Sequence, residues 1–136
     1  MAEEIASLEK MGTWKAVPLP EGRKTVGCKW VYRTKRDADG NPVRYKARLV
    51  AKGYSQVYGL DFDETYAPIT RLETICLLLG LAVVKDWEVK QFDVKTAYLY
   101  GDLKEEIYMD PPPGYDIPEG FVLLLIKALY GLRQAG

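Results

Sequence analysis

The stretch Gln91–Gly101 places one carboxylate where metal-dependent phosphoryl transfer could use it. Asp93 ends a run in which Trp87, Val89 and Gln91 occupy every second position. In a β-strand, residues with this spacing share one face. A strand that ends in an Asp can present a hard oxygen ligand to Mg²⁺, which completes its shell with water and phosphate. More often, however, such an Asp forms a turn or caps a helix. The spacing alone leaves both interpretations open.

Composition describes one globular domain. The chain has 136 residues, of which 48% are hydrophobic and 28% charged, so it can bury a core. It contains no histidine, which excludes His-based catalysis and His-ligated zinc. Cys28 and Cys76 lie far apart, and we expect both thiols to be reduced. The acidic N-terminus is unlike a signal peptide, and the apolar run 77–84 is too short to span a bilayer. We therefore expect a cytoplasmic protein without membrane contact.

The formal net charge is zero, but the charges are divided unevenly along the sequence. Residues 23–52 hold ten Lys and Arg against two acids, whereas residues 53–136 carry a net charge of −6. The basic residues alternate along two segments, 26–36 and 43–52, that flank a turn-forming sequence at 37–42 and predict a β-hairpin. A solvated sheet face is one interpretation, and a surface for nucleic acid or nucleotide phosphate is the other. The candidate nucleic-acid-binding residues are Arg33, Lys35, Arg36, Arg44 and Lys52.

The remaining patterns predict an α+β fold, an antiparallel sheet with packed helices. Residues 2–11 predict a helix that ends at Gly12, and 14–18 a strand. A capping box at 70–73 precedes an almost wholly apolar helix, which we expect at the centre of the core. We further expect strands at 87–93, 106–109 (returning from it as a hairpin) and 121–127, and the start of a helix at 129–136. The acidic cluster at 61–64 predicts a solvated loop, with a metal site as the alternative.

Five motifs, in this order and spacing, resemble the reverse transcriptase of copia-type LTR retrotransposons from about Trp14 to Gly136. They are Cys28-Lys-Trp-Val-Tyr32, Tyr45-Lys-Ala-Arg-Leu-Val-Ala-Lys-Gly-Tyr54, Glu64-Thr-Tyr-Ala-Pro68, Asp93-Val-Lys-Thr-Ala-Tyr-Leu99 and Leu129-Tyr-Gly-Leu-Arg-Gln134. The resemblance implies one truncated domain over 1–136 of a right-hand polymerase, with residues 14–85 similar to the fingers and 86–136 to the start of the palm. Its partners would be an RNA or DNA primer–template and a dNTP.

The resemblance also assigns roles to single residues. Asp93 matches the first catalytic aspartate, a ligand of the catalytic Mg²⁺ ions, and the backbone carbonyl of Val94 would be a further metal ligand. Thr96 and Ala97 match the positions whose N–H groups hold the triphosphate. Tyr98 matches the aromatic steric gate under the nucleotide sugar.

Two cations are implied to lie over the triphosphate. Lys46 and Arg48 fall in the fingers strand that folds over it in similar enzymes, and the match leaves open which of the two makes the contact. Cations on a hairpin that face a metal site would neutralise phosphate charge, which agrees with these roles.

The sequence departs from the family at a second site. Right-hand polymerases use an aromatic-x-Asp-Asp hairpin for the two-metal reaction, and this sequence contains no Asp-Asp pair. We therefore expect the chain alone to bind Mg²⁺ weakly or not at all and to be inactive alone. The alternatives are a non-enzymatic module that binds nucleic acid or protein, and a phosphotransferase in which Asp93 works with Asp61 or Asp63. We also expect an unpaired sheet edge beside 87–93 and 121–127, and hence self-association as a homo-oligomer or docking on the missing palm and thumb.

Overall fold

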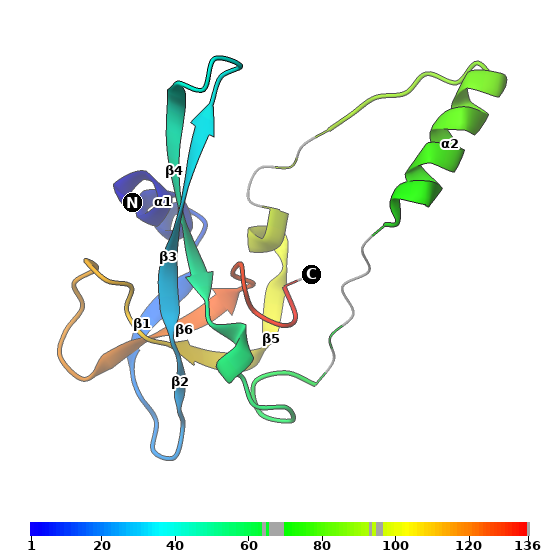
Figure 1. Cartoon of the computed structure of the whole chain (residues 1–136). Coiled ribbons are helices and arrows are strands. Elements are labelled where there is room, and N and C mark those ends of the chain that lie inside the picture. The colour runs from blue at the N-terminus through cyan, green and yellow to red at the C-terminus, as the bar shows by residue number, and fades with distance from the viewer. Residues whose placement is uncertain (64, 66–69, 93, 95–96, 136) are drawn as a thin grey trace.

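The computed structural model describes residues 1–63, 65, 70–92, 94 and 97–135, which form two β-sheets, two α-helices and two 3₁₀ turns (Figure 1). In chain order the elements are α1 (Ala2–Lys10), β1 (Trp14–Pro18), β2 (Thr25–Val26), β3 (Cys28–Arg36), β4 (Pro42–Ala51), η1 (Gly53–Ser55), α2 (Leu72–Val84), η2 (Ala97–Tyr100), β5 (Asp102–Met109) and β6 (Phe121–Lys127). The class is mixed α and β with mainly antiparallel pairing, as predicted. Within the described residues, no helix combines the length and the apolar content needed to cross a bilayer.

The larger sheet has the strand order β1-β6-β5-β2. β6 pairs antiparallel with both β1 and β5, while the short β2 runs parallel to β5. The expected unpaired edge beside residues 121–127 is therefore wrong, because β1 and β5 cover β6 on both sides. The sheet also joins strands from the two sequence ranges that the resemblance assigns to fingers and palm.

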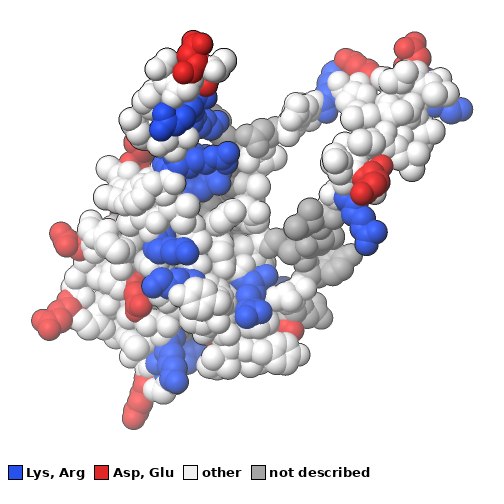
Figure 2. Space-filling model, viewed as in Figure 1, with Lys and Arg blue, Asp and Glu red and all other residues white. Residues whose placement is uncertain are grey.

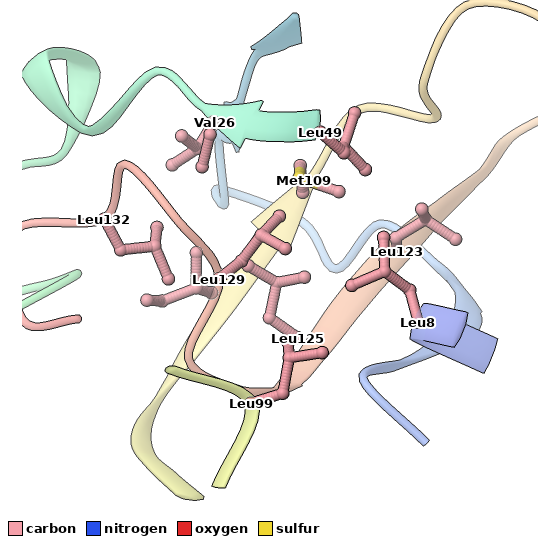
Figure 3. Close-up of a cluster of buried hydrophobic side chains, with 11 residues drawn as sticks. Leu8, Val26, Leu49, Leu99, Met109, Leu123, Leu125, Leu129 and Leu132 are labelled. Carbon is pink, nitrogen blue, oxygen red and sulfur yellow. The ribbon is translucent and has the colours of Figure 1, made fainter. Parts of the chain in front are cut away.

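The hydrophobic core lies where this sheet meets α1, the end of β4 and the C-terminal turn (Figure 3). Leu123 and Leu125 of β6 and Met109 of β5 are almost fully buried there, and Leu8 and Leu49 approach from α1 and β4. Removing each such side chain from water contributes about 1.5–3 kcal/mol. The core thus fixes both the sheet and the base of the hairpin.

The predicted β-hairpin is confirmed as the two-stranded sheet of β3 and β4. Asp37 closes its turn, because its Oδ1 accepts hydrogen bonds from the N–H groups of Asp39 and Asn41 at 3.1 and 2.8 Å. In the observed register Arg33 lies opposite Lys46, and Lys35 opposite Arg44. The basic side chains alternate with aromatic and aliphatic ones, so most of them share one face of the hairpin.

The helix at the N-terminus is confirmed, but the second helix differs from its prediction. α2 begins after Arg71 without any side-chain cap, so the capping box does not form. Ala82 is its one buried residue, and Figure 1 shows α2 apart from both sheets. The prediction that this helix forms the centre of the core is wrong. An apolar pattern predicts a helix that is buried, but it does not specify the surface against which the helix packs.

Two further predictions of secondary structure are wrong. Residues 87–92 form no strand, because no described strand lies beside them to satisfy their backbone hydrogen bonds; the strand at 102–109 pairs with β6 instead of returning from 87–93. Residues 129–135 form turns and not the start of a helix. There, Leu129 and Leu132 point into the core, and Gly131 adopts φ = +95°, which an α-helix excludes.

Candidate functional site

A cavity of about 410 Å³ lies between the hairpin, α1 and the segments around residues 94–99 and 129–130. Its lining includes five of the residues to which the resemblance assigns a nucleotide or metal role: Lys46, Arg48, Val94, Ala97 and Tyr98. These residues come from two parts of the sequence that are about fifty positions apart. Buried Leu49 and Leu99 anchor the two parts in the common core.

The strand β4 explains how the two cations reach this cavity. Lys46 and Arg48 are two residues apart, so their side chains leave the same face of the strand. Both side chains are exposed, while Leu49 and Ala51 at the end of the strand are buried. The cavity therefore has exposed cations on a strand whose base is fixed.

Tyr130 belongs to the same cavity, although the sequence predicted no role for it. The Arg48 guanidinium lies 5.7 Å from the centroid of the Tyr130 ring, a cation–π distance. The ring of Tyr98 meets that of Tyr130 edge-on, with centroids 5.4 Å apart and an angle of 82°. Both tyrosines remain open to a ligand, with 41% and 44% of their surface exposed. The signal for Tyr130 was its position in the fifth motif, 129–134.

The structure describes only part of the predicted metal-binding and phosphate-binding site. Asp93 and Thr96 lie outside the described residues. Of the described acidic residues, Glu4 of α1 lines the cavity. Where the structure describes the chain, no group of three or more His, Cys, Asp or Glu side chains could hold a metal ion. The metal-binding prediction therefore depends on Asp93 and on the Val94 carbonyl beside it.

Most of the predicted nucleic-acid-binding residues lie on the exposed hairpin, where Figure 2 shows blue side chains along its length. Arg33, Lys35 and Arg44 are exposed on β3 and β4. Arg36 lies at the turn, where its guanidinium donates to the Gly40 carbonyl at 2.7 Å. Like charges that lie opposite each other repel unless an anion compensates them, so this face favours a polyanionic ligand.

Lys52 has different surroundings from the other cations. Its side chain is half-buried beyond the end of β4, and its N–H donates to the Gly27 carbonyl at 2.8 Å. A Cβ placed on Gly27 would lie 3.6 Å from the Lys52 Nζ and 3.8 Å from Asp110 Oδ2, so these charges share one small region. Lys52 therefore lies in the same small region as Asp110, and its contact with nucleic acid stays a prediction.

The thiol of Cys28 lies in the same region. Burial, and then the negative charge of Asp110, raise the pKa of Cys28 to about 11, although Lys52 opposes the shift. Cys28 Sγ donates to the Asp110 carbonyl at 3.4 Å. Both cysteines are free, as expected, and Cys76 is exposed on α2. A protonated, half-buried thiol is a poor nucleophile, so Cys28 is structural.

The prediction of a solvated loop for the acidic cluster at 61–64 is wrong for Asp61. Asp61 is buried, and its Oδ2 accepts a hydrogen bond from the Val57 N–H at 2.8 Å. Asp63 is exposed, and Glu64 lies outside the described residues. Asp61 thus closes a local turn.

Comparison with known proteins identifies the family. Residues 11–136 match the sequence model of the family described as "Reverse transcriptase (RNA-dependent DNA polymerase)". The chain is 51% identical over 137 residues to the retrovirus-related Pol polyprotein from transposon TNT 1-94 of Nicotiana tabacum. It is 46% identical over 139 residues to the corresponding polyproteins from transposons RE1 and RE2 of Arabidopsis thaliana. Each of the three alignments covers 99% of this chain.

The chain therefore belongs to the reverse transcriptase family of retrotransposon Pol polyproteins, which confirms the resemblance. It spans about a tenth of the length of the curated relatives it matches. No solved structure matches the chain.

Proposed function

We propose that this chain forms the part of an RNA-directed DNA polymerase that receives the incoming dNTP and contacts the primer–template. The observation that carries the proposal is the common cavity of Lys46, Arg48, Val94, Ala97 and Tyr98. A pocket with cations on one wall and aromatic rings on another suits a nucleoside triphosphate, because the cations neutralise phosphate and the rings contact sugar and base.

Each residue with a predicted nucleotide-binding role has a task in this proposal. Arg48 lies over Tyr130 and can bind triphosphate oxygens with its planar guanidinium. Lys46 adds a second positive charge, and the backbone N–H groups of Thr96 and Ala97 hold the phosphates from the other side. Tyr98 supports the sugar and excludes a 2′-hydroxyl. Together they orient the nucleotide and offset its charge before any reaction.

Mg²⁺ enters the proposal through Asp93 and the Val94 carbonyl. Two oxygen ligands of this kind suit Mg²⁺, which keeps several waters and phosphate oxygens in its shell. When bound, the ion neutralises phosphate charge and polarises the phosphoryl group. The family's two-metal reaction needs a further carboxylate pair, and this sequence has no Asp-Asp. For the 136-residue chain we therefore propose binding without polymerisation.

The basic hairpin would contact the primer–template, with Arg33, Lys35, Arg36 and Arg44 against phosphates. In polymerase terms the hairpin and its surroundings, residues 14–85, correspond to the fingers, and residues 86–136 to the beginning of the palm. The support for this is the order of the five motifs and the exposed cations of β3 and β4.

A binding experiment with Arg48→Gln tests the proposal. Titration of the ¹⁵N-labelled chain with dATP and Mg²⁺ should shift signals of Tyr98 and Tyr130. Loss of a charge-assisted contact to phosphate should weaken dATP about tenfold or more in the Arg48→Gln variant. Arg71→Gln, the same change at an exposed site outside the cavity, should leave the affinity unchanged. Equal affinities for the two variants would reject the assigned pocket.

Primer extension separates the proposal from its main alternative, a non-enzymatic nucleic-acid-binding or protein-interaction module. We expect salt-sensitive binding to primer–template without extension. Extension that Asp93→Asn abolishes would mean that a second set of carboxylates is supplied from elsewhere, for example by a second copy of the chain. Binding to primer–template without any response to dATP would favour the non-enzymatic module, which the basic face of the hairpin alone supports.

A further inference from the structure

Two glutamine side chains form a hydrogen-bonded clamp next to the cavity. Gln56, which is 7% exposed, donates from Nε2 to Gln134 Oε1 at 2.9 Å, and its Oε1 accepts from the Arg133 N–H at 2.8 Å. Gln134 donates onward to the Asp61 carbonyl at 2.8 Å. Neither glutamine lines the cavity. Gln56 is buried and Gln134 is half-buried, and such amides are costly to disturb because each lost partner leaves a desolvated polar group.

The clamp holds a turn that is already close to β4. The N–H of Ala51 donates to the Tyr130 carbonyl at 2.8 Å. Gly131 and Gly53 allow this approach: a Cβ on Gly131 would overlap the Ala51 carbonyl, and one on Gly53 would overlap the Gly131 carbonyl. The backbone of Tyr130 is thus held against β4 directly, and the residues that follow it, Arg133 and Gln134, are held by Gln56.

Tyr130 links the clamp to the cavity. Its ring lies 5.7 Å from the Arg48 guanidinium and 5.4 Å from the Tyr98 ring, so a shift of the turn changes both contacts. Tyr98 is the residue proposed to sense the sugar. Tyr130 contacts the Tyr98 ring edge-on, and it lies three and four residues before Arg133 and Gln134, which Gln56 holds by hydrogen bonds.

We propose that Gln56 and Gln134 are positioning residues that set the place of the Tyr130 ring and thereby tune the discrimination between deoxyribonucleotides and ribonucleotides. The part that concerns nucleotides rests on the proposed function. The part that concerns the placement of Tyr130 is independent of it. A purely structural pair would affect stability without changing the preference for one sugar over the other.

The test uses Gln56→Glu and Gln134→Glu. Each keeps the size of the side chain but replaces the donating Nε2 by a carboxylate oxygen that faces other oxygens, Gln134 Oε1 in one case and the Asp61 carbonyl in the other. Asn41→Asp is the control, because it makes the same amide-to-carboxylate change at an exposed position outside the cavity. Gln56→Met, which is neutral and of similar length, replaces Gln56→Glu if that variant does not fold.

Two readouts are measured on the 136-residue chain. The first is the NMR signal of ¹³C-labelled Tyr130 in the free protein, with the methyl group of buried Met109 as a reporter of the intact core. The second is the ratio of the dissociation constants for dATP and ATP in the presence of Mg²⁺. We expect both clamp variants to shift the Tyr130 signal, to leave Met109 in place, and to change the ratio by about threefold or more. Asn41→Asp should change neither.

The outcomes are distinct. An unmoved Tyr130 signal in a folded clamp variant overturns the positioning role. A moved signal with an unchanged dATP to ATP ratio overturns the role in discrimination. If the unmodified chain binds neither nucleotide, the proposed function fails, and the Tyr130 signal of the free protein alone decides whether the clamp positions that ring.

Discussion

Gly131 shows at the scale of one residue why the C-terminal turn needs glycine. Its φ of +95° lies in a region that residues with a Cβ rarely adopt. A Cβ there would also lie 2.6 Å from Val50 Cγ1 and would overlap the Ala51 carbonyl. The close approach of the turn to β4, and with it the position of Tyr130, depends on the missing side chain.

We predict that Gly131→Ala lowers the free energy of unfolding by roughly 2–4 kcal/mol, from backbone strain and overpacking together. Gly120→Ala is the control, because Gly120 has φ = +79° but open space around it. Strain alone should cost about 1–2 kcal/mol there. Urea unfolding of both variants gives the difference, and equal losses would mean that close packing at Gly131 contributes nothing.

The two cysteines should differ in reactivity. The pKa of Cys28, raised to about 11 by burial and by Asp110, keeps its thiol protonated at pH 8, while Cys76 is exposed. We predict that iodoacetamide labels Cys76 at least about tenfold faster than Cys28 in the folded chain. Mass spectrometry of the labelled peptides measures the two rates, and the urea-unfolded chain is the control. Comparable rates in the folded chain would contradict the burial of Cys28.

The raised pKa of Cys28 also makes the free energy of unfolding depend on pH. Folding favours the protonated thiol, so this contribution is fully present below about pH 9, the ordinary pKa of the thiol. It is lost as the pH rises from about 9 to about 11. The alkylation of Cys28 should accelerate over the same interval, because thiolate and unfolded chain increase together.

At the scale of the elements, the hairpin combines like charges in a way that stability alone does not favour. Lys35 lies opposite Arg44, and Arg33 opposite Lys46. A cross-strand pair of opposite charges would instead stabilise the hairpin by about 0.2–1 kcal/mol. The proposed contact with nucleic-acid phosphates would account for this arrangement, since phosphates would compensate the cations.

Lys35→Glu tests that explanation. We predict a slightly more stable protein that binds primer–template more weakly and loses about one unit of the slope of log K against log salt. Lys15→Glu, the same charge change on exposed β1, should leave binding nearly unchanged. Fluorescence anisotropy at several salt concentrations measures both. Equal losses for the two variants would mean that net charge, and not the hairpin face, governs binding.

The elements also show what could be predicted from the sequence. The strands at 14–18 and 121–127 have the expected bounds, because local turn signals and apolar runs define them. The predictions of a strand over 87–92 and of a helix at the C-terminal turn were wrong for a different reason. Whether an apolar alternation becomes a strand, or a leucine-rich end a helix, depends on partners that only the tertiary structure supplies.

The candidate site divides in the same way. Lys46, Arg48, Ala97 and Tyr98 could be named in advance because they lie in motifs that resemble a known family, and their nucleotide roles remain predictions. Tyr130 was missed although it lies in such a motif, since its contacts with Arg48 and Tyr98 join residues that are 82 and 32 positions apart. The Gln56–Gln134 pair joins residues 78 positions apart and has no local signal.

For the molecule as a whole, α2 is the helix that packs least against the rest of the described chain. Its 13 residues are almost entirely apolar, yet Val83 and Val84 are 82% and 80% exposed. An isolated helix of this length is marginal in water, and exposed apolar surface of this kind favours association. A formal net charge of zero adds no repulsion between copies of the chain. These properties together favour burial of α2 against another protein surface.

We predict that the 136-residue chain associates with itself in a concentration-dependent manner through α2, since burying each Leu or Val there contributes about 1.5–3 kcal/mol. Leu77 and Val84 are seven residues apart on one face of α2. The double substitution Leu77→Lys and Val84→Lys should reduce the association constant at least about tenfold. The control places Lys at Val43 and Val57, which are also exposed but lie outside α2. Sedimentation velocity over a range of concentrations distinguishes the two. A monomer at every concentration, with a sharp unfolding transition, would mean that α2 is covered within one chain in solution, because a free helix of this composition could not remain both exposed and stable.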